Sequence, residues 1–306
     1  MSTTPFHAGT VAIVGRANAG KSSLLNAFLG ETVSVASPVA QTTRRVARGI
    51  LNEDGLQIVF LDTPGIRRAT HTLGSLLNRT ARGMVTGAEV ALLVLDASQK
   101  PHDEDEGWMR KLATEDSRIF AVLNKTDLGN RRAAFEKLWE DVVAQYRAKS
   151  AAFEPPPIRW FEVSATEGDG VAELLREIRA LMPVAPPMFP LDLLTDDPGP
   201  FFIADVIRAE INARLKAELP HAIAVATDSV EEENGVVQVQ ATIYVEKSSQ
   251  RPIVIGARAK MIRDIRHAAE KSLREIYGVP HKVSLWVKVE PDWSRNYWML
   301  KKFGYV

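Results

Sequence analysis

The sequence predicts an α/β domain with a mostly parallel sheet, followed by a smaller α+β domain. Between Thr10 and about Met182, short apolar and β-branched runs alternate with helical patterns, as in sheets whose strands are buried on both faces. Six prolines then fall within residues 183–200, and the pattern changes after them. At 306 residues the chain has room for two hydrophobic cores. We therefore expect a first domain over residues 1–182, a linker over 183–200 and a second domain over 201–306.

The first domain should contain five strands. Each run is apolar and short, which favours a buried strand over an amphipathic helix. A helical pattern over Arg131–Arg147 separates the last two runs, and another over Val171–Leu181 follows the last one. Alternating β and α elements predict parallel strands joined by crossover helices. The expected strands are Val11–Val14, Gln57–Leu61, Val90–Leu95, Ile119–Leu123 and Arg159–Val163.

The linker and the second domain follow. Proline lacks an amide hydrogen and restricts φ, so we expect residues 183–200 to form a semi-stiff linker without a helix or a central strand. The next elements are a helix, a hairpin whose turn contains an Asn-Gly pair, a second helix, a third strand and a short terminal helix. The first helix is expected over Phe201–Leu219, the hairpin over Ile223–Val245, the third strand over Val283–Val289 and the terminal helix from Pro291. The second helix should have its apolar face at Ile262, Ile265, Ala269, Leu273 and Ile276.

Composition limits the possible functions. The hydrophobic content of 45% and charged content of 25% are ordinary for a globular protein. The chain has no cysteine, which excludes disulfides, Cys-ligated metals and thiol nucleophiles. Its longest apolar run, Val90–Leu95, is far shorter than the roughly 20 residues of a membrane helix, and the N-terminus lacks a signal-peptide pattern. We expect a cytoplasmic protein.

The first motif is a phosphate-binding loop. Residues 15–22 match GxxxxGK[ST] directly after an expected strand, the context in which this motif binds phosphates. Backbone amides and the following helix N-terminus attract phosphate, Lys21 should reach the β- and γ-phosphates, and Ser22 should bind Mg²⁺. The alternative is a Gly-rich turn. The expected GTP contacts here are Gly15, Asn18, Ala19, Gly20, Lys21, Ser22 and Ser23.

Two further segments concern the γ-phosphate and Mg²⁺. Asp62 ends a strand and begins Asp-Thr-Pro-Gly, so its carboxylate can hold Mg²⁺ through water while the Gly65 amide contacts the γ-phosphate; the alternative is an ordinary turn. In Gln41-Thr42-Thr43-Arg44, a hydroxyl can complete the Mg²⁺ shell. We choose Thr43, with Thr42 as the alternative. Hydrolysis should depend on Lys21, Ser22, Thr43, Asp62 and Gly65 and be slow, on the order of 10⁻⁴ to 10⁻² s⁻¹ without an activator.

The last two segments predict guanine recognition. Asp127, in Asn124-Lys125-Thr126-Asp127, can accept hydrogen bonds from N1–H and the 2-amino group of guanine, donors that adenine lacks. Asn124 can bond the base edge, and Lys125 can lie along the ring. In Ser164-Ala165-Thr166, the Ala165 amide is the candidate partner of guanine O6. The alternatives are helix caps at Asp127 and Ser164, and an ATP-dependent enzyme that shares only the phosphate loop.

These motifs resemble those of the translation-factor-related GTPases, and Gln41–Arg44 is similar to the Era family, in which a GTPase domain precedes a type II KH domain. Ile253–Gly256 before a basic helix resembles the family's KH loop, and Trp286–Val289 with the ending Leu300–Tyr305 resembles its last strand and tail. The resemblance implies a monomer that binds the 3′ end of small-subunit ribosomal RNA and acts in assembly of the small ribosomal subunit. It also implies peripheral contact with the inner face of the cell membrane.

The resemblance also has consequences at two positions of the GTPase domain. Asn18 matches a phosphate-loop position that relatives use to bind K⁺, which leads to the hypothesis that K⁺ accelerates hydrolysis through Asn18. Ile66 stands where many GTPases have a glutamine that orients the attacking water. The residues that activate the attacking water must therefore differ from those of GTPases that have this glutamine.

The second domain departs from the KH pattern at one residue. KH domains clamp the nucleic-acid backbone with Gly-x-x-Gly, and this chain has Gly256-Ala257-Arg258-Ala259. If residue 259 needs a positive φ, alanine is penalised, whereas alanine is harmless if that residue is already helical. We favour the helical alternative, because a strong helix pattern follows.

A basic run supports RNA binding. Seven basic and two acidic residues lie between Arg251 and Arg274, although such a run can also be a solvated helix face. The rival function is a membrane-associated signalling or cell-cycle GTPase whose second domain docks protein. We expect Trp286, Trp293, Tyr297 and Trp298 to pack in the core rather than stack on bases. The expected RNA contacts are Gly256, Ala257, Arg258, Ala259, Lys260, Arg263 and Arg266.

Overall fold

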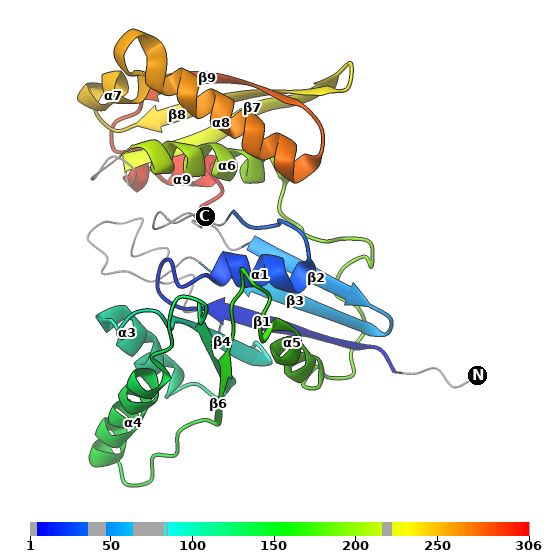
Figure 1. The fold of residues 1–306 in the computed structure, drawn as a ribbon, viewed down its shortest axis with the longest axis vertical. Helices are drawn as coiled ribbons and strands as arrows, with labels where there is room; N and C mark the ends of the chain where they lie inside the picture. Colours follow the sequence, from blue (N-terminus) through cyan, green and yellow to red (C-terminus); the bar gives the residue numbers. More distant parts are fainter. Residues whose placement is uncertain (1–4, 36–46, 64–82, 84, 216–221, 306) are drawn as a thin grey trace. The chain divides into compact units, whose positions relative to one another are not determined.

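The structure is a computed structural model, which describes residues 5–35, 47–63, 83, 85–215 and 222–305 (Figure 1). The described residues fall into two compact units, with the boundary between Asp196 and Asp197. None of the helices in this described part is long and apolar enough to cross a membrane.

The first unit is built on a six-stranded sheet in the order β2-β3-β1-β4-β5-β6. All neighbours are parallel except β2 and β3, which are antiparallel. The five predicted strands are present, and the structure adds β2, whose sequence lacks a continuous apolar run because it lies at the sheet edge. The strands are β1 (His7–Val14), β2 (Ala47–Glu53), β3 (Leu56–Asp62), β4 (Val90–Asp96), β5 (Arg118–Asn124) and β6 (Ile158–Glu162).

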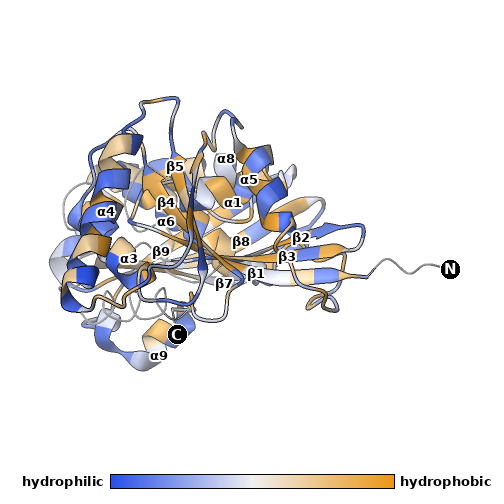
Figure 2. Ribbon diagram, turned by 90° about the horizontal axis from the view of Figure 1, so that it is seen from below, coloured by the Kyte–Doolittle hydropathy of each residue, from blue (hydrophilic) through white to orange (hydrophobic). Residues whose placement is uncertain are grey.

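Helices cover both faces of this sheet. One core joins α1 and α5 to the sheet, and a second core joins α3 and α4 to the opposite face. Along β4, Leu92 and Val94 enter the first core, whereas Leu93 and Leu95 enter the second, as the two-residue repeat of a strand requires. In Figure 2, the apolar central strands lie between α4 and the pair α1 and α5. The helices are α1 (Lys21–Leu29), α3 (Asp103–Leu112), α4 (Arg132–Lys149) and α5 (Val171–Arg179).

The proline-rich segment is attached to the sheet edge. The Ile50 amide donates to Leu194 O at 2.8 Å. The buried Gln57 side chain donates to Phe189 O at 2.9 Å and accepts from the Met188 and Phe189 amides at 2.7 and 3.0 Å. The expectation that no helix reaches residue 200 is wrong, because α6 begins at Gly199. Pro200 is tolerated there because the first turn of a helix has no partners for its amides.

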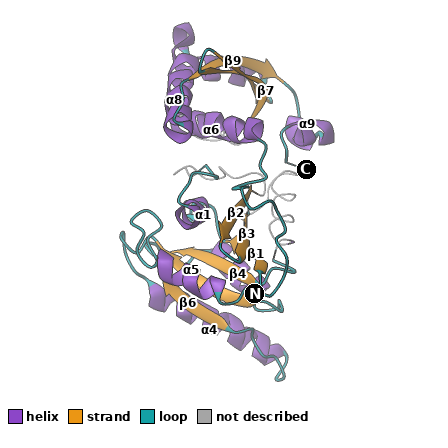
Figure 3. Cartoon of the chain, turned by 90° about the vertical axis from the view of Figure 1, so that its right-hand side faces the viewer, coloured by secondary structure: helices purple, strands orange, loops and turns teal. Residues whose placement is uncertain are grey.

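The second unit has a three-stranded sheet in the order β7-β8-β9, with β7 antiparallel and β9 parallel to β8. The predicted hairpin is confirmed, and its turn residues Asn234 and Gly235 have φ of 53° and 75°. Helices α6 and α8 lie side by side along the sheet (Figure 3). The elements are α6 (Gly199–Arg214), β7 (Ile223–Glu233), β8 (Val236–Val245), α7 (Arg251–Ile255), α8 (Lys260–Tyr277), β9 (His281–Val289) and α9 (Tyr297–Lys302). This α+β unit and the α/β unit before it are the predicted fold classes.

The aromatic residues near the C-terminus divide into two groups. Trp293 is fully buried and meets the Phe303 ring edge-on at 5.4 Å, as predicted. The prediction of core packing is wrong for Trp286, Tyr297 and Trp298, which are 51%, 59% and 72% exposed. Trp286 falls on an exposed position of the alternating β9 strand.

The loop before α8 corrects the expectation for residue 259. Ala259 has φ 58° and ψ 26°, so it occupies the left-handed region as the N-cap of α8 rather than its first turn. Arg258 before it is also left-handed, with φ 49°. At Gly256, φ is 74° and an added Cβ would lie 2.6 Å from Met261 Cβ, so only glycine fits.

We predict that Ala259→Gly stabilises the protein. The left-handed region is unfavourable for alanine, and the relief outweighs the extra flexibility that glycine brings to the unfolded chain. The free energy of unfolding in urea should rise by about 0.5–1 kcal/mol. The matched control is Ala268→Gly within α8, which should lower this free energy by about 1 kcal/mol. Equal destabilisation by both substitutions would contradict the prediction.

Candidate functional site

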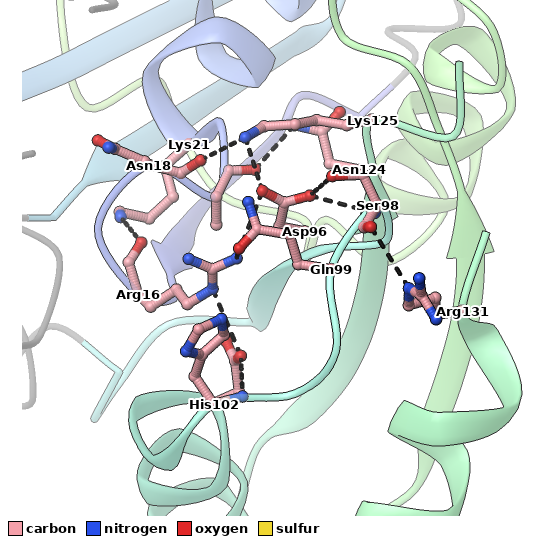
Figure 4. Close-up of polar contacts among 12 residues, drawn as sticks. Arg16, Asn18, Lys21, Asp96, Ser98, Gln99, His102, Asn124, Lys125 and Arg131 are labelled. Carbon is pink, nitrogen blue, oxygen red and sulfur yellow. Dashed lines mark hydrogen bonds and ion pairs between the residues drawn. The ribbon is translucent and has the colours of Figure 1, made fainter. Parts of the chain in front are cut away.

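The parallel sheet brings the sequence motifs together. Strands β1, β3, β4 and β5 end at the same edge, and the segment after β6 joins them there. The structure therefore assembles residues 15–22, Asp62, Asn124–Asp127 and Ser164–Thr166 around one site, part of which is drawn in Figure 4. The predicted residues Thr42, Thr43, Gly65 and Ile66 lie outside the described residues.

The phosphate loop connects β1 to α1, and its glycines are required by space as well as by φ. Gly15 has φ 145°, and an added Cβ would lie 2.3 Å from Val94 O. Gly20 has φ 95°, and its Cβ would lie 2.1 Å from Asn124 Nδ2. The loop therefore packs directly on β4 and on the guanine motif. Because α1 begins at Lys21, its free amides face the loop, which is the arrangement that binds anions.

Lys21 is buried in this loop. Its Nζ donates to Arg16 O at 2.8 Å and to Gly15 O at 3.2 Å. Burial lowers the pKa of Lys21 to about 8, although the nearby Asp62 carboxylate favours the charged form. A phosphate anion beside this ammonium group would favour its charged form.

Asp62 and Ser22 form a donor set that fits Mg²⁺. The Asp62 carboxylate is fully buried, and its Oδ2 accepts from Ser22 Oγ at 2.7 Å and Ser34 Oγ at 2.8 Å. Its Oδ1 is buried and has no hydrogen-bond partner among the residues that the structure describes. Burial raises the pKa of Asp62 despite the Lys21 charge and the two hydroxyl donors. A hard cation bound beside this carboxylate and hydroxyl would give Asp62 Oδ1 a partner and would favour the ionised form of Asp62.

The guanine motif is tied to both neighbouring loops. The buried Asn124 side chain donates from Nδ2 to Ala19 O at 2.9 Å, and its Oδ1 accepts from the Ala165 amide at 3.0 Å. Asp127 is exposed, and its Oδ1 accepts from Ser164 Oγ at 2.6 Å. Lys125 has φ 64° and donates to Asn18 O at 2.7 Å. Asn124 Oδ1 and the single N–H of the Ala165 amide are thus hydrogen-bonded to each other here, and the contacts with the base predicted for these two residues stay predictions.

Three residues of the site were missed by the sequence analysis. Ser34 donates to Asp62 and is held by Asn26, whose side chain bonds the Ser34 amide and carbonyl. Arg16 and Asp96 form an ion pair at 3.3 Å beside Lys125. For Asp96 a signal was present, because it ends a buried parallel strand just as Asp62 does.

In the second unit, the expected RNA contacts lie on the loop before α8 and on its first turns. Arg258, Lys260 and Arg263 are exposed and make no ion pair with any described residue. Arg266 is less exposed and contacts His267 at 2.7 Å. Gly256, Ala257 and Ala259 form the turn that presents this basic group.

Comparison with known proteins identifies two families along the chain. A family model described as 50S ribosome-binding GTPase matches residues 10–125, and a KH domain model matches residues 218–294. The chain is 38% identical to GTPase Era of Geobacter metallireducens and 36% identical to GTPase Era of Geotalea daltonii, in each case over the full length of both chains.

Two solved structures are similar to this one over nearly all of both chains. One is an Aquifex aeolicus Era variant bound to GDP and AlF4⁻, with a TM-score of 0.82 at 31% identity, covering 98% of this chain and 100% of that one. The other is Era in complex with MgGDPNP and nucleotides 1506–1542 of 16S ribosomal RNA, with a TM-score of 0.83 at 31% identity, covering 98% and 99%.

The pKa of Lys21 predicts a pH dependence of nucleotide binding. A bound phosphate should raise the pKa of Lys21 above its value of about 8 in the free protein, so binding should take up a proton as the pH rises through 8. The affinity for GDP should be constant below about pH 7 and fall as the pH rises through 8, by at most tenfold per pH unit.

Calorimetry without Mg²⁺ between pH 7 and 9, in buffers of different ionisation enthalpy, measures both the affinity and the proton uptake. Lys21→Met is the control, and its weaker affinity should not change with pH over this range. A constant Kd without proton uptake in the unmodified protein would refute the prediction.

Proposed function

The chain belongs to the GTPase Era family, and on that premise we propose that it couples GTP binding and hydrolysis to binding of the 3′ end of small-subunit ribosomal RNA during assembly of that subunit. It is a GTPase with a KH domain. We assign the GTP-binding domain to residues 1–182, the linker to 183–200 and the RNA-binding domain to 201–306.

In the GTPase domain, different residues of the site bind the phosphates, the metal ion and the base. Lys21 and the loop amides hold the phosphates, and Ser22 and Asp62 hold Mg²⁺, which offsets negative charge on the phosphates when it is bound. Asp127, positioned by the Ser164 hydroxyl, selects guanine. We assign the second hydroxyl ligand of Mg²⁺ to Thr43 and the γ-phosphate contact to the Gly65 amide.

The observation that carries the RNA proposal is the relative whose structure holds MgGDPNP and nucleotides 1506–1542 of 16S ribosomal RNA, since its chain aligns with 98% of this one. The second unit offers the chemistry for such a ligand. Gly256 allows a close approach of the backbone, and Arg258, Lys260 and Arg263 present unpaired charge beside it within the described part of the chain.

We further propose that the protein binds RNA more tightly with GTP than with GDP. It acts as a monomer and resides in the cytoplasm, with peripheral contact to the inner face of the cell membrane. The switch residues would differ between the GTP and GDP states and so shift the population that binds RNA. The alternative is a membrane-associated signalling GTPase whose second domain docks protein, and RNA binding separates the two.

The direct test is binding to a single-stranded RNA copied from the 3′ end of small-subunit ribosomal RNA. We expect tighter binding with a non-hydrolysable GTP analogue than with GDP, tighter binding than to a scrambled RNA, and weaker binding as salt increases. The slope of log K against log salt is negative. Its magnitude should fall by about 0.7 for each of Lys260→Ala and Arg263→Ala, because each substitution removes one phosphate contact.

Lys137→Ala provides the matched control, since this exposed lysine lies on α4 of the first unit. It should leave the slope unchanged. Binding that equals the binding of scrambled RNA in both nucleotide states would exclude the RNA proposal and favour protein docking.

The K⁺ hypothesis makes a separate prediction. Asn18 has φ 62° and lies in the phosphate loop, where a K⁺ ion can stabilise charge that develops during hydrolysis. GTP turnover should be faster in KCl than in NaCl at equal ionic strength, and Asn18→Ala should remove most of this difference. Equal rates in the two salts would disprove the role of K⁺.

A further inference from the structure

Asp96 lies between the two segments that hold the nucleotide, although neither motif contains it. It is the last residue of β4, and β4 lies between β1, which leads into the phosphate loop, and β5, which leads into the guanine motif. Its side chain is fully buried. Figure 4 shows the carboxylate at the centre of a group of polar side chains.

Both oxygens of this carboxylate are used. Oδ1 accepts from the Ser98 amide at 3.1 Å and from Ser98 Oγ at 2.5 Å, which sets the orientation of the carboxylate. Oδ2 accepts from Lys125 Nζ at 2.7 Å and pairs with Arg16 at 3.3 Å. One oxygen therefore contacts a side chain from each of the two segments.

The contact with Lys125 reaches the phosphate loop a second time. Lys125 Nζ also donates to Asn18 O at 2.7 Å, so its ammonium group bridges Asp96 and the loop backbone. Arg16 belongs to the same loop, and its carbonyl accepts from Lys21. Loss of the Asp96 charge would remove the carboxylate partner of Lys125 and one of the partners of Arg16.

Asp96 is ionised at neutral pH. Burial alone would raise its pKa, but hydrogen bonds from Lys125 and Ser98 and the charges of Lys125 and Arg16 outweigh burial and lower it. The carboxylate is therefore a permanent counter-charge for the two cations.

We propose that Asp96 is a positioning residue for the guanine nucleotide, which holds Lys125 against the phosphate loop and thereby slows nucleotide release. This inference rests on the proposed placement of the nucleotide between these segments. Arg16 also pairs with Asp105 at 3.4 Å and contacts Gln99 at 3.2 Å, so it keeps partners without Asp96. Lys125 has no second carboxylate partner in the described part of the structure.

The test is a double-mutant cycle on GDP affinity and release. Asp96→Asn keeps the shape of the side chain and removes its charge, and it should raise the Kd of GDP about 10- to 100-fold, mostly through koff. In the Lys125→Met background, Asp96→Asn should change the Kd less than about twofold, because the group on which it acts is gone. A residue needed only for folding would have the same effect in both backgrounds.

Asp105→Asn is the matched control. Asp105 is also buried and also pairs with Arg16, but it makes no contact with Lys125. Its substitution should change the Kd of GDP less than about threefold. If Asp96→Asn fails to fold, Ser98→Ala replaces it in the cycle, since it removes the hydroxyl that orients Asp96, and it should raise the Kd of GDP several-fold only where Lys125 is present.

The outcomes separate this inference from the function on which it rests. If the unmodified protein does not bind GDP, the proposed nucleotide site is wrong. If it binds GDP and Asp96→Asn binds equally well, or loses affinity equally in the Lys125→Met background, only the positioning role is overturned.

Discussion

The nucleotide site depends on the buried amide of Asn124, which joins three loops. Its Nδ2 bonds the carbonyl of Ala19 in the phosphate loop, and its Oδ1 bonds the amide of Ala165 after β6. This contact is possible because Gly20 has no side chain, since a Cβ there would lie 2.1 Å from Asn124 Nδ2. The phosphate loop and the guanine motif are thereby held at one spacing.

Two aspartates end strands on either side of β1, and their surroundings give them different uses. Asp62 has hydroxyl donors on one oxygen and, among the described residues, none on the other, and burial raises its pKa. Asp96 has donors on both oxygens and two cations nearby, which lower its pKa. The first still needs a cation, and so fits Mg²⁺, whereas the second already holds its cations and acts on the positions of its neighbours.

In the second unit, a strained turn precedes the basic residues at the start of α8. Arg258 and Ala259 both adopt left-handed conformations, and Gly256 adopts a positive φ that no side chain would fit. Such a turn exposes the basic residues at the start of α8. Because Gly256 has no side chain, it also leaves room for the backbone of a bound nucleic acid, as in the proposed function. Strained residues of this kind are typical of binding sites, where function rather than stability selects the conformation.

The sequence by itself determined the α/β and α+β classes, five strands of the first sheet, the hairpin and the residues of the nucleotide motifs, because all of these depend on local periodicity or on short motifs whose chemistry is in their spacing. It did not indicate β2, which is an edge strand without a continuous apolar run, and it placed Ala259 in a helix and Trp286, Tyr297 and Trp298 in the core. Only the tertiary structure decided these, together with the contacts of Arg16, Ser34 and Asp96. The reason is physical: backbone conformation at a loop, exposure of an aromatic ring and pairing of a buried charge depend on neighbours that are distant in the chain and meet only when the sheet has formed.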